Sequence, residues 1–169
     1  KAVFSEMWRV LKNHGRIVLS DVLSEEPLPI HMRVNSHLWG ECIAGALTEE
    51  EFLVYLEQAG FYGLQILNKR YWKEVEGYSF FSMTIRGYKL EKTLPRIFQG
   101  QTAIYLGPQK AVIDEEGHFF PRNEPVEICS DTAKKLSKPP YKGRFKVLET
   151  GVKNSSVEAA CCEPDSPCC

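Results

Sequence analysis

The feature that most constrains the fold is an amphipathic segment that ends at a glycine and leads directly into a run of apolar residues. Between residues 3 and 11, six apolar side chains recur at helical spacing, and Gly15 suits the left-handed position after a helix. Ile17, Val18 and Leu19 then follow consecutively, which is typical of a strand covered on both faces in a parallel sheet. This order predicts half of a doubly wound α/β unit.

The next part of the chain predicts the end of such a sheet. A helix is expected from Ile30 to about Glu41, and Thr48 and Glu51 have the spacing of a capping box that opens another helix. Apolar and polar residues alternate most clearly in the second of two long strand candidates, separated by a turn at Glu76-Gly77. These strands are expected over residues 64–73 and 79–90. They predict an antiparallel hairpin with one wetter face.

From Pro95 the sequence changes to short strand candidates and one short helix. We therefore expect three parts: residues 1–94 in the α/β sheet, residues 95–149 in a small α+β domain, and residues 150–169 in a flexible, cysteine-rich tail. The strand candidates are residues 102–106, 110–114, 125–128 and 145–148, and the helix begins at Ser130 or Asp131.

Charge and hydropathy exclude several classes of partner. The chain of 169 residues has 21 Lys+Arg against 22 Asp+Glu and a formal charge of −1, so it has no basic surface for nucleic acid or an anionic membrane. No apolar run approaches the roughly 20 residues of a membrane span, and the first residues form no signal peptide. With 43% apolar residues the chain can bury a core, and we expect it in the cytoplasm.

The cysteines are distributed unevenly. Cys42 and Cys129 lie far apart, whereas Cys161, Cys162, Cys168 and Cys169 fall within the last nine residues. This spacing cannot cross-link a core, so we expect a reducing compartment and thiols kept for soft-metal or redox chemistry. Cys129 follows a strand pattern and is expected in a core. The tail thiols either capture a soft cation or belong to an inert terminus.

Residues 4–21, Phe4-Ser5-Glu6-Met7-Trp8-Arg9-Val10-Leu11-Lys12-Asn13-His14-Gly15-Arg16-Ile17-Val18-Leu19-Ser20-Asp21, resemble the closing half of class I S-adenosyl-L-methionine-dependent methyltransferases. There a similar helix end leads into the fifth strand of a Rossmann-like sheet. The resemblance implies a glycine-rich donor loop upstream of Lys1, because this chain contains none. We expect a segment of a longer protein, inactive alone, whose partner is the upstream donor-binding half.

The segment Leu38-Trp39-Gly40-Glu41-Cys42-Ile43-Ala44-Gly45-Ala46-Leu47 resembles the arsenite methyltransferase family more narrowly. In that family the cysteine of this motif is a thiolate ligand of trivalent arsenic, which implies that Cys42 is a substrate-binding residue. The family's later cysteine lies in a stretch that here reads Gly77-Tyr78-Ser79-Phe80-Phe81-Ser82-Met83-Thr84-Ile85-Arg86. Tyr78 or Ser79 stands at its position, and no cysteine occurs there.

These observations predict the C-terminal portion of a Rossmann-like methyltransferase sheet followed by a small α+β domain. The predicted reaction of the intact protein is methyl transfer to arsenite or a related thiophilic acceptor, because soft thiolates bind a soft centre well. Two alternatives stay open. One is a non-catalytic thiol module that binds soft metals, and the other is a methyltransferase that acts on a small organic acceptor.

Overall fold

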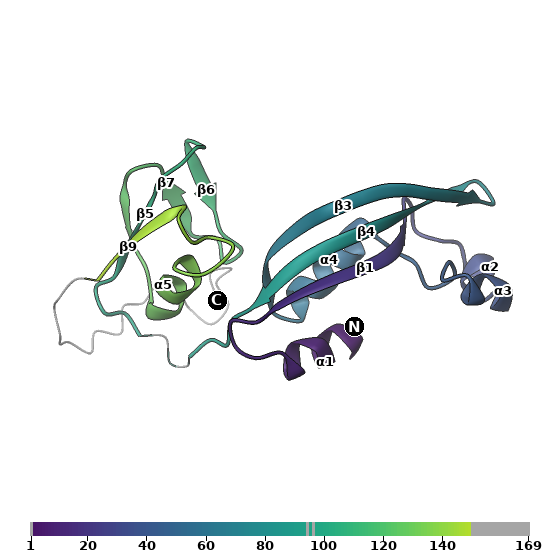
Figure 1. The fold of residues 1–169 in the computed structure, drawn as a ribbon, viewed down its shortest axis with the longest axis horizontal. Helices are drawn as coiled ribbons and strands as arrows, with labels where there is room; N and C mark the ends of the chain where they lie inside the picture. The colour runs from purple at the N-terminus through teal and green to yellow at the C-terminus, as the bar shows by residue number, and fades with distance from the viewer. Residues whose placement is uncertain (1, 94, 96, 150–169) are drawn as a thin grey trace. The chain divides into compact units, whose positions relative to one another are not determined.

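The computed structural model describes residues 2–93, 95 and 97–149. The chain divides into two compact units, Lys1–Leu90 (unit 1) and Glu91–Cys169 (unit 2), shown in Figure 1. None of the helices in the described ranges is long and apolar enough to cross a membrane.

Unit 1 is built on a four-stranded sheet with the strand order β2-β1-β4-β3. Strand β1 runs antiparallel to β4 along its whole length and parallel to β2 only at Leu23 and Ser24. The prediction that Ile17 to Leu19 lie between parallel strands is therefore wrong for the described residues, because the strand that pairs with them, β4, is antiparallel. The elements are α1 (Ala2–Val10), β1 (Arg16–Ser24), α2 (Ile30–Arg33), α3 (Ser36–Gly40), β2 (Leu47–Thr48), α4 (Glu49–Gln58), β3 (Phe61–Val75) and β4 (Tyr78–Lys89).

One face of this sheet carries the main core of unit 1. Helices α1 and α4 cover it, and the rings of Phe4 and Phe52 meet edge to face with centroids 5.2 Å apart. On the opposite face the hydroxyls of Ser20 and Thr84 are hydrogen-bonded at 2.8 Å, and Val18 is 54% exposed. The described residues thus cover residues 17–20 of β1 on one face only, whereas Val22 and Ser24 near its end are covered on the other face too. The buried core members are Phe4, Ile17, Leu23, Phe52, Leu56, Phe61, Met83 and Ile85.

The helix predicted from Ile30 to about Glu41 is two short helices. Asn35 interrupts it, because its side-chain oxygen accepts hydrogen bonds from the backbone N–H groups of His37 and Leu38 at 3.0 and 3.4 Å. Asn35 is therefore the N-cap of α3, and a side chain that bonds its own backbone competes with a continuous helix. The capping box predicted at Thr48 and Glu51 is confirmed at the start of α4.

Strands β3 and β4 form the expected hairpin, with Glu76 and Gly77 at positive φ in its turn. Strand β3 is an edge strand with three register shifts against β4. The last of them lies between Tyr71 and Lys73, so Trp72 is the extra residue of a β-bulge. Bulges of this kind protect an edge strand from pairing with other chains and re-aim its side chains.

Unit 2 has a three-stranded sheet of order β8-β5-β9 and a separate two-stranded hairpin, β6 with β7. Its core combines both with α5, and in it the ring of Phe145 contacts the rings of Tyr105 and Phe120. Strand β7 was not among the predicted strands. The elements are β5 (Thr102–Tyr105), β6 (Ala111–Ile113), β7 (Phe119–Pro121), β8 (Pro125–Glu127), α5 (Ser130–Leu136) and β9 (Phe145–Leu148).

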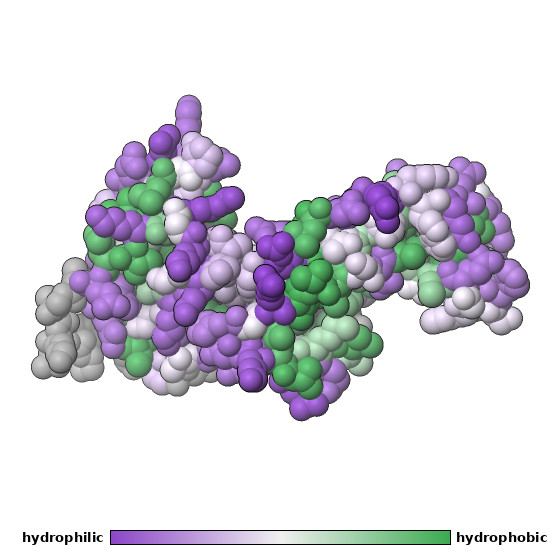
Figure 2. Space-filling model, in the orientation of Figure 1, coloured by the Kyte–Doolittle hydropathy of each residue, from purple (hydrophilic) through white to green (hydrophobic). Residues whose placement is uncertain are grey.

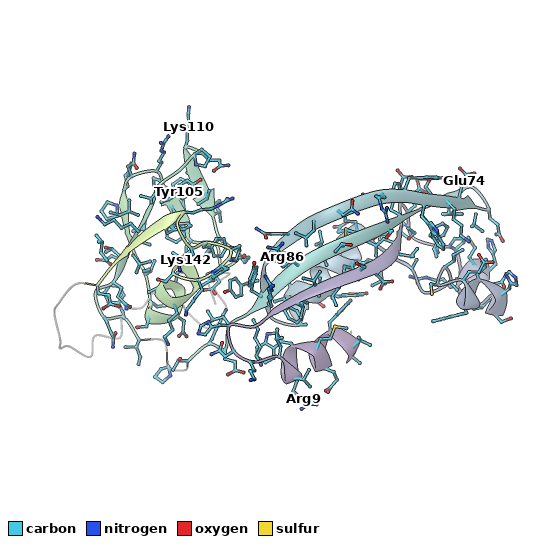
Figure 3. All side chains as sticks on the ribbon, viewed as in Figure 1. Arg9, Glu74, Arg86, Tyr105, Lys110 and Lys142 are labelled. Carbon is cyan, nitrogen blue, oxygen red and sulfur yellow. The ribbon has the colours of Figure 1, made fainter. Side chains whose placement is uncertain are left out.

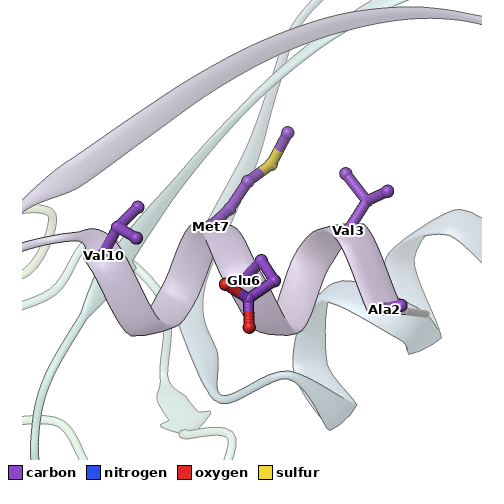
Figure 4. A pocket seen from close by; sticks show the side chains of 5 residues that line it. All are labelled: Ala2, Val3, Glu6, Met7 and Val10. Carbon is purple, nitrogen blue, oxygen red and sulfur yellow. The ribbon is translucent and has the colours of Figure 1, made fainter.

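The apolar stripe predicted on the first helix is divided between two sides. Phe4, Trp8 and Leu11 face the core, whereas Val3 and Val10 are 61% and 67% exposed. Figure 2 shows apolar side chains gathered over α1. Val3 and Val10, together with Met7 between them, point the same way along a shallow groove of about 410 Å³ (Figure 4), which Ala2 and Glu6 also line.

Candidate functional site

Cys42 lies in the loop 41–46 between α3 and β2, which we call the cysteine loop. Its backbone has a φ of 61°, a left-handed conformation that is uncommon for a residue with a side chain. Its N–H donates to the carbonyl of Trp39 at 3.1 Å, and the N–H of Ile43 donates to Leu38 at 2.9 Å. Cys42 is exposed, while Ile43 and Ala44 beside it are buried. The loop is thus anchored on both sides of an accessible free thiol.

Trp39 packs against the other end of the cysteine loop. Its indole N–H donates to the backbone carbonyl of Arg33 at 2.9 Å, although the side chain is 60% exposed. A methyl group added at Gly45 would lie 3.4 Å from two carbons of the Trp39 ring. Because Gly45 has no Cβ, the Trp39 ring can lie close to the loop backbone.

A second apolar cluster joins the cysteine loop to the hairpin. Ile43 and Ala44 of the loop are buried in one cluster with Phe80 of β4, and Tyr78 packs against that cluster. Figure 1 shows α2 and α3 at the same end of unit 1 as the hairpin tip, which the labelled Glu74 marks in Figure 3. The other buried members are Leu28, Met32, Leu38 and Ala46.

Of the two hairpin positions, the structure brings Tyr78 to the cysteine loop. Side chains alternate along a strand, so Tyr78 shares a face with Phe80, and Ser79 lies on the opposite face. Ser79 instead meets the end of β1 through its backbone, where its carbonyl accepts from the N–H of Glu25 at 3.0 Å. The hairpin position that packs with the cysteine loop therefore carries a phenol, and Cys42 is the one cysteine among the described residues of unit 1.

An ion pair also links the loop to the hairpin. Glu41, the residue before Cys42, accepts a hydrogen bond from Lys73 of β3, and the Lys73 ammonium lies 4.5 Å from the centroid of the Trp72 ring. The hydrogen bond and charge of Lys73 lower the pKa of Glu41. His37 lies 3.5 Å from Glu41 as a helical neighbour. Within the described ranges no three His, Cys, Asp or Glu side chains form a group that could hold a metal.

Cys129 is far from this arrangement in sequence and belongs to unit 2. It is half-buried at the N-cap position of α5, and its sulfur lies 3.3 Å from the hydroxyl of Thr132. The structure therefore gives Cys129 a packing environment and does not group it with another cysteine of the described part. Cys161, Cys162, Cys168 and Cys169 lie outside the described residues.

One fully buried charge was missed from the sequence. The adjacent Lys134 and Lys135 predict a solvated helix face, but Lys135 is only 2% exposed and pairs with the carboxylate of Asp114 at 2.8 Å. Asp114 also contacts the ring of His118 at 2.9 Å. Lys135 further lies 3.5 Å from Glu115 and 3.6 Å from Glu116. We call these five residues the carboxylate–lysine cluster.

Comparisons with known proteins cover both units. Residues 92–168 match a family described as Domain of unknown function (DUF8838). Arsenite methyltransferase from Homo sapiens is 30% identical over 164 residues, which cover 89% of this chain and 43% of that protein. Arsenite methyltransferase from Mus musculus is 30% identical over 144 residues, covering 78% and 38%. The chain thus spans less than half the length of these two relatives.

A solved structure adds the fold. The crystal structure of an arsenic (III) S-adenosylmethionine methyltransferase from Chlamydomonas reinhardtii is 27% identical, with a TM-score of 0.51, and covers 88% of this chain and 54% of that one. The mixed α/β fold class predicted from the sequence is confirmed by this match. The chain therefore resembles the C-terminal part of a class I S-adenosylmethionine-dependent methyltransferase. More narrowly, it resembles the arsenite methyltransferase family, as the motif around Cys42 indicated.

Proposed function

We propose that this chain is the acceptor-binding part of an S-adenosyl-L-methionine-dependent methyltransferase that acts on trivalent arsenic, with Cys42 as a thiolate ligand. The observation that carries the proposal is the exposure of Cys42 in an anchored loop of left-handed backbone. A cysteine kept only for packing would be buried like its neighbours Ile43 and Ala44. Strained backbone that presents an accessible side chain is typical of functional sites.

The chemistry of Cys42 follows from the softness of both partners. A deprotonated thiol binds trivalent arsenic by displacing an oxygen ligand, which leaves as water once protonated. The buried cluster beneath the loop, which includes Ile43 and Phe80, keeps one side of this centre apolar. The arsenic lone pair is then the group that accepts a methyl group.

The described residues do not fit the methyl donor itself. No turn among the described residues has the G-x-G spacing that cradles the donor in this fold class. The passage from β1 to α2, for example, is Glu25-Glu26-Pro27-Leu28-Pro29, which is acidic and contains two prolines. We therefore assign the donor site to an upstream half of the protein. The relatives named arsenite methyltransferase, of which this chain spans 43% and 38%, support this assignment.

The surface of unit 1 offers two features that suit such an upstream half. In the described part, residues 16–22 of β1 pair only with β4, so the other edge of β1 is open to a further strand. The exposed Val18 and the groove along α1 add apolar surface that association would bury. The same proposal requires reduced thiols, which favours the cytoplasm.

Arsenite titration of the chain under reducing conditions tests the role of Cys42. We expect Cys42→Ser to abolish the arsenite-dependent change in tryptophan fluorescence, because Trp39 lies against the cysteine loop, and Cys129→Ser to leave it intact. If the response follows Cys129 or survives Cys42→Ser, Cys42 is not the ligand. In the full-length enzyme the same pair of variants should divide methyl transfer in the same way.

Methyl transfer to a small organic acceptor is the second candidate, and Tyr78 favours it. The phenol stands where the family places a further thiolate, and a hydroxyl or ring can contact an organic acceptor. In the full-length enzyme this candidate predicts that Cys42→Ser retains methyl transfer and that Tyr78→Ala loses it. The arsenic proposal predicts the reverse order of sensitivity.

A further inference from the structure

The two sides of the proposed acceptor site come from segments that the chain folds separately. Cys42 lies in the loop between α3 and β2, whereas Tyr78 begins β4 at the hairpin tip. Only packing and polar contacts between them can fix the distance from the thiol to the hairpin. The shared apolar cluster supplies the packing, but such a cluster is non-directional and allows small sliding motions.

Lys73 is placed to supply the missing directional contact. In the register of the hairpin it lies opposite Phe80, and the next two pairs are Glu74 with Ser79 and Val75 with Tyr78. From this position its ammonium reaches Glu41, the residue directly before Cys42. One ion pair therefore connects the backbone at the thiol to the strand segment that faces Tyr78.

The β-bulge at Trp72 accounts for this direction of Lys73. Tyr71 lies opposite Phe81 and Lys73 lies opposite Phe80, so the extra residue turns Lys73 to the other face of the sheet from Tyr71. That face is the one on which Phe80 packs with the cysteine loop. The Trp72 ring, 4.5 Å from the ammonium, restricts Lys73 further.

We infer that Lys73 is a positioning residue: through its ion pair with Glu41 it holds the Cys42 thiol at a fixed place over the Tyr78 face of the hairpin. This inference rests on the proposed function. The side chains of Lys73 and Glu41 are 32% and 39% exposed, and ion pairs this accessible to water contribute little to stability. The ion pair therefore affects the position of the Cys42 thiol more than the stability of the fold, so the two effects can be measured separately.

A dithiol reporter measures this geometry. In a chain whose Cys129, Cys161, Cys162, Cys168 and Cys169 are replaced by Ser, Tyr78→Cys adds one thiol on the face of the cysteine loop. Phenylarsine oxide bonds two thiolates that converge and binds a single thiol weakly, so its affinity reports whether Cys42 and position 78 meet. Ser79→Cys in the same background is the matched control on the opposite face and should bind weakly.

Lys73→Met in the reporter chain should weaken phenylarsine oxide binding by on the order of tenfold, because the thiols lose part of their effective concentration. Lys73→Arg keeps the charge and should retain binding, and the exchange Glu41→Lys with Lys73→Glu should restore it. His31→Ala removes a different polar bridge to the hairpin, His31 to Glu76 at 3.0 Å, and should leave affinity unchanged. Thermal unfolding is measured for each variant, and the charge exchange provides the test if Lys73→Met alone unfolds.

The outcomes distinguish a failure of the positioning role of Lys73 from a failure of the proposed acceptor site. If Lys73→Met and Glu41→Gln bind phenylarsine oxide as tightly as the reporter chain, Lys73 does not position the thiol, although the proposed site stands. If the reporter chain with Lys73 intact binds no better than the Ser79→Cys control, Cys42 and position 78 do not converge. That result overturns the proposed site together with the role of Lys73.

Discussion

Lys73 and Lys135 each connect a hairpin to a helical element, and they do so in opposite environments. Lys73 links β3 to the cysteine loop after α3 and is about a third exposed, whereas Lys135 links α5 to the turn between β6 and β7 and is 2% exposed. An ion pair that is partly exposed to water contributes little to stability, whereas a buried charge that loses its partner destabilises the fold. The same contact therefore positions a site in unit 1 and maintains the fold in unit 2.

The largest expected effect comes from Lys135→Met. The substitution leaves Asp114, 3% exposed, without its ammonium partner, and unit 2 should lose about 3–5 kcal/mol of unfolding free energy. Amide hydrogen exchange in β5 and β9 reports this loss. All three tryptophans lie in unit 1, so the fluorescence transition on denaturation should stay near its original midpoint.

Lys134→Met is the matched control for this prediction. Lys134 is the next residue in α5, but its side chain is 51% exposed where it pairs with Asp131. Its loss should change stability by less than about 1 kcal/mol. Equal effects of the two substitutions would contradict the contrast between buried and exposed lysines.

The same cluster predicts how unit 2 responds to pH. Burial works to raise the pKa of Asp114, but the hydrogen bond to His118 and the charge of Lys135 outweigh it and hold the pKa far below the ordinary 3.8. Because the folded pKa is depressed, this stability is present above the unfolded pKa and is lost as the pH falls below it. Burial likewise works to lower the pKa of Lys135, but the neighbouring carboxylates raise it above 10.5.

Denaturation midpoints measured at several pH values check this window. Unit 2 should keep its stability from about pH 4 to about pH 10.5 and lose it beyond both limits, since a raised lysine pKa contributes stability that disappears as the pH rises through it. Asp114→Asn should flatten the acid side of the profile. An acid loss of the same size in Asp114→Asn would assign it to other carboxylates.

Gly60→Ala should have an intermediate effect, and it acts in the core of unit 1. Gly60 has a φ of +100°, and an added Cβ would lie 2.8 Å from the indole nitrogen of Trp8. The strain and the contact together should cost about 1–3 kcal/mol, measured by tryptophan fluorescence during urea unfolding. Gly40→Ala is the control, because nothing lies within 4 Å of its Cβ position. A neutral Gly60→Ala would mean that Trp8 can move aside freely.

The predictable part of the fold was the part with local signals. The capping box at Thr48, the turn at Glu76-Gly77 and the last strand, Phe145–Leu148, each depend on neighbouring residues, and each was found from the sequence. The break at Asn35 was missed, because apolar spacing continued across it while its side chain capped a new helix. The bulge at Trp72 depends on pairing with another strand, which a single strand's pattern does not contain.

The candidate site, too, was predictable only where its signal was local. A motif indicated Cys42, but its exposure depends on how the loop is anchored, and the choice between Tyr78 and Ser79 required the register of the hairpin. The burial of Lys135 could not be predicted, because its partner Asp114 is 21 residues away and no periodic pattern relates them. Side chains that act across tertiary contacts leave little trace in local sequence.

No effect at all is expected when the chain alone is titrated with S-adenosylmethionine. The described residues contain no turn with the G-x-G spacing that a donor site of this fold class uses. Isothermal titration calorimetry should therefore show no saturable heat. A site of micromolar affinity would refute the assignment of the donor to an upstream half and would give unit 1 a second role beside the cysteine loop.

The smallest expected effect on folding is that of removing residues 150–169. Cys161, Cys162, Cys168 and Cys169 lie in a polar, proline-containing sequence with few apolar side chains to bury, so neither the core of unit 1 nor the carboxylate–lysine cluster should depend on them. The melting temperature should stay nearly unchanged, while the stoichiometry of arsenite or mercuric ion bound under reducing conditions should fall, because vicinal thiols chelate a soft ion together. The matched control is the untruncated chain of residues 1–169 with these four cysteines replaced by Ser, which should bind the same number of ions as the truncated chain. A cooperative loss of fold on truncation would show that the tail is part of the folded structure. An unchanged stoichiometry would show that the tail thiols do not bind soft metals and would leave Cys42 as the candidate ligand.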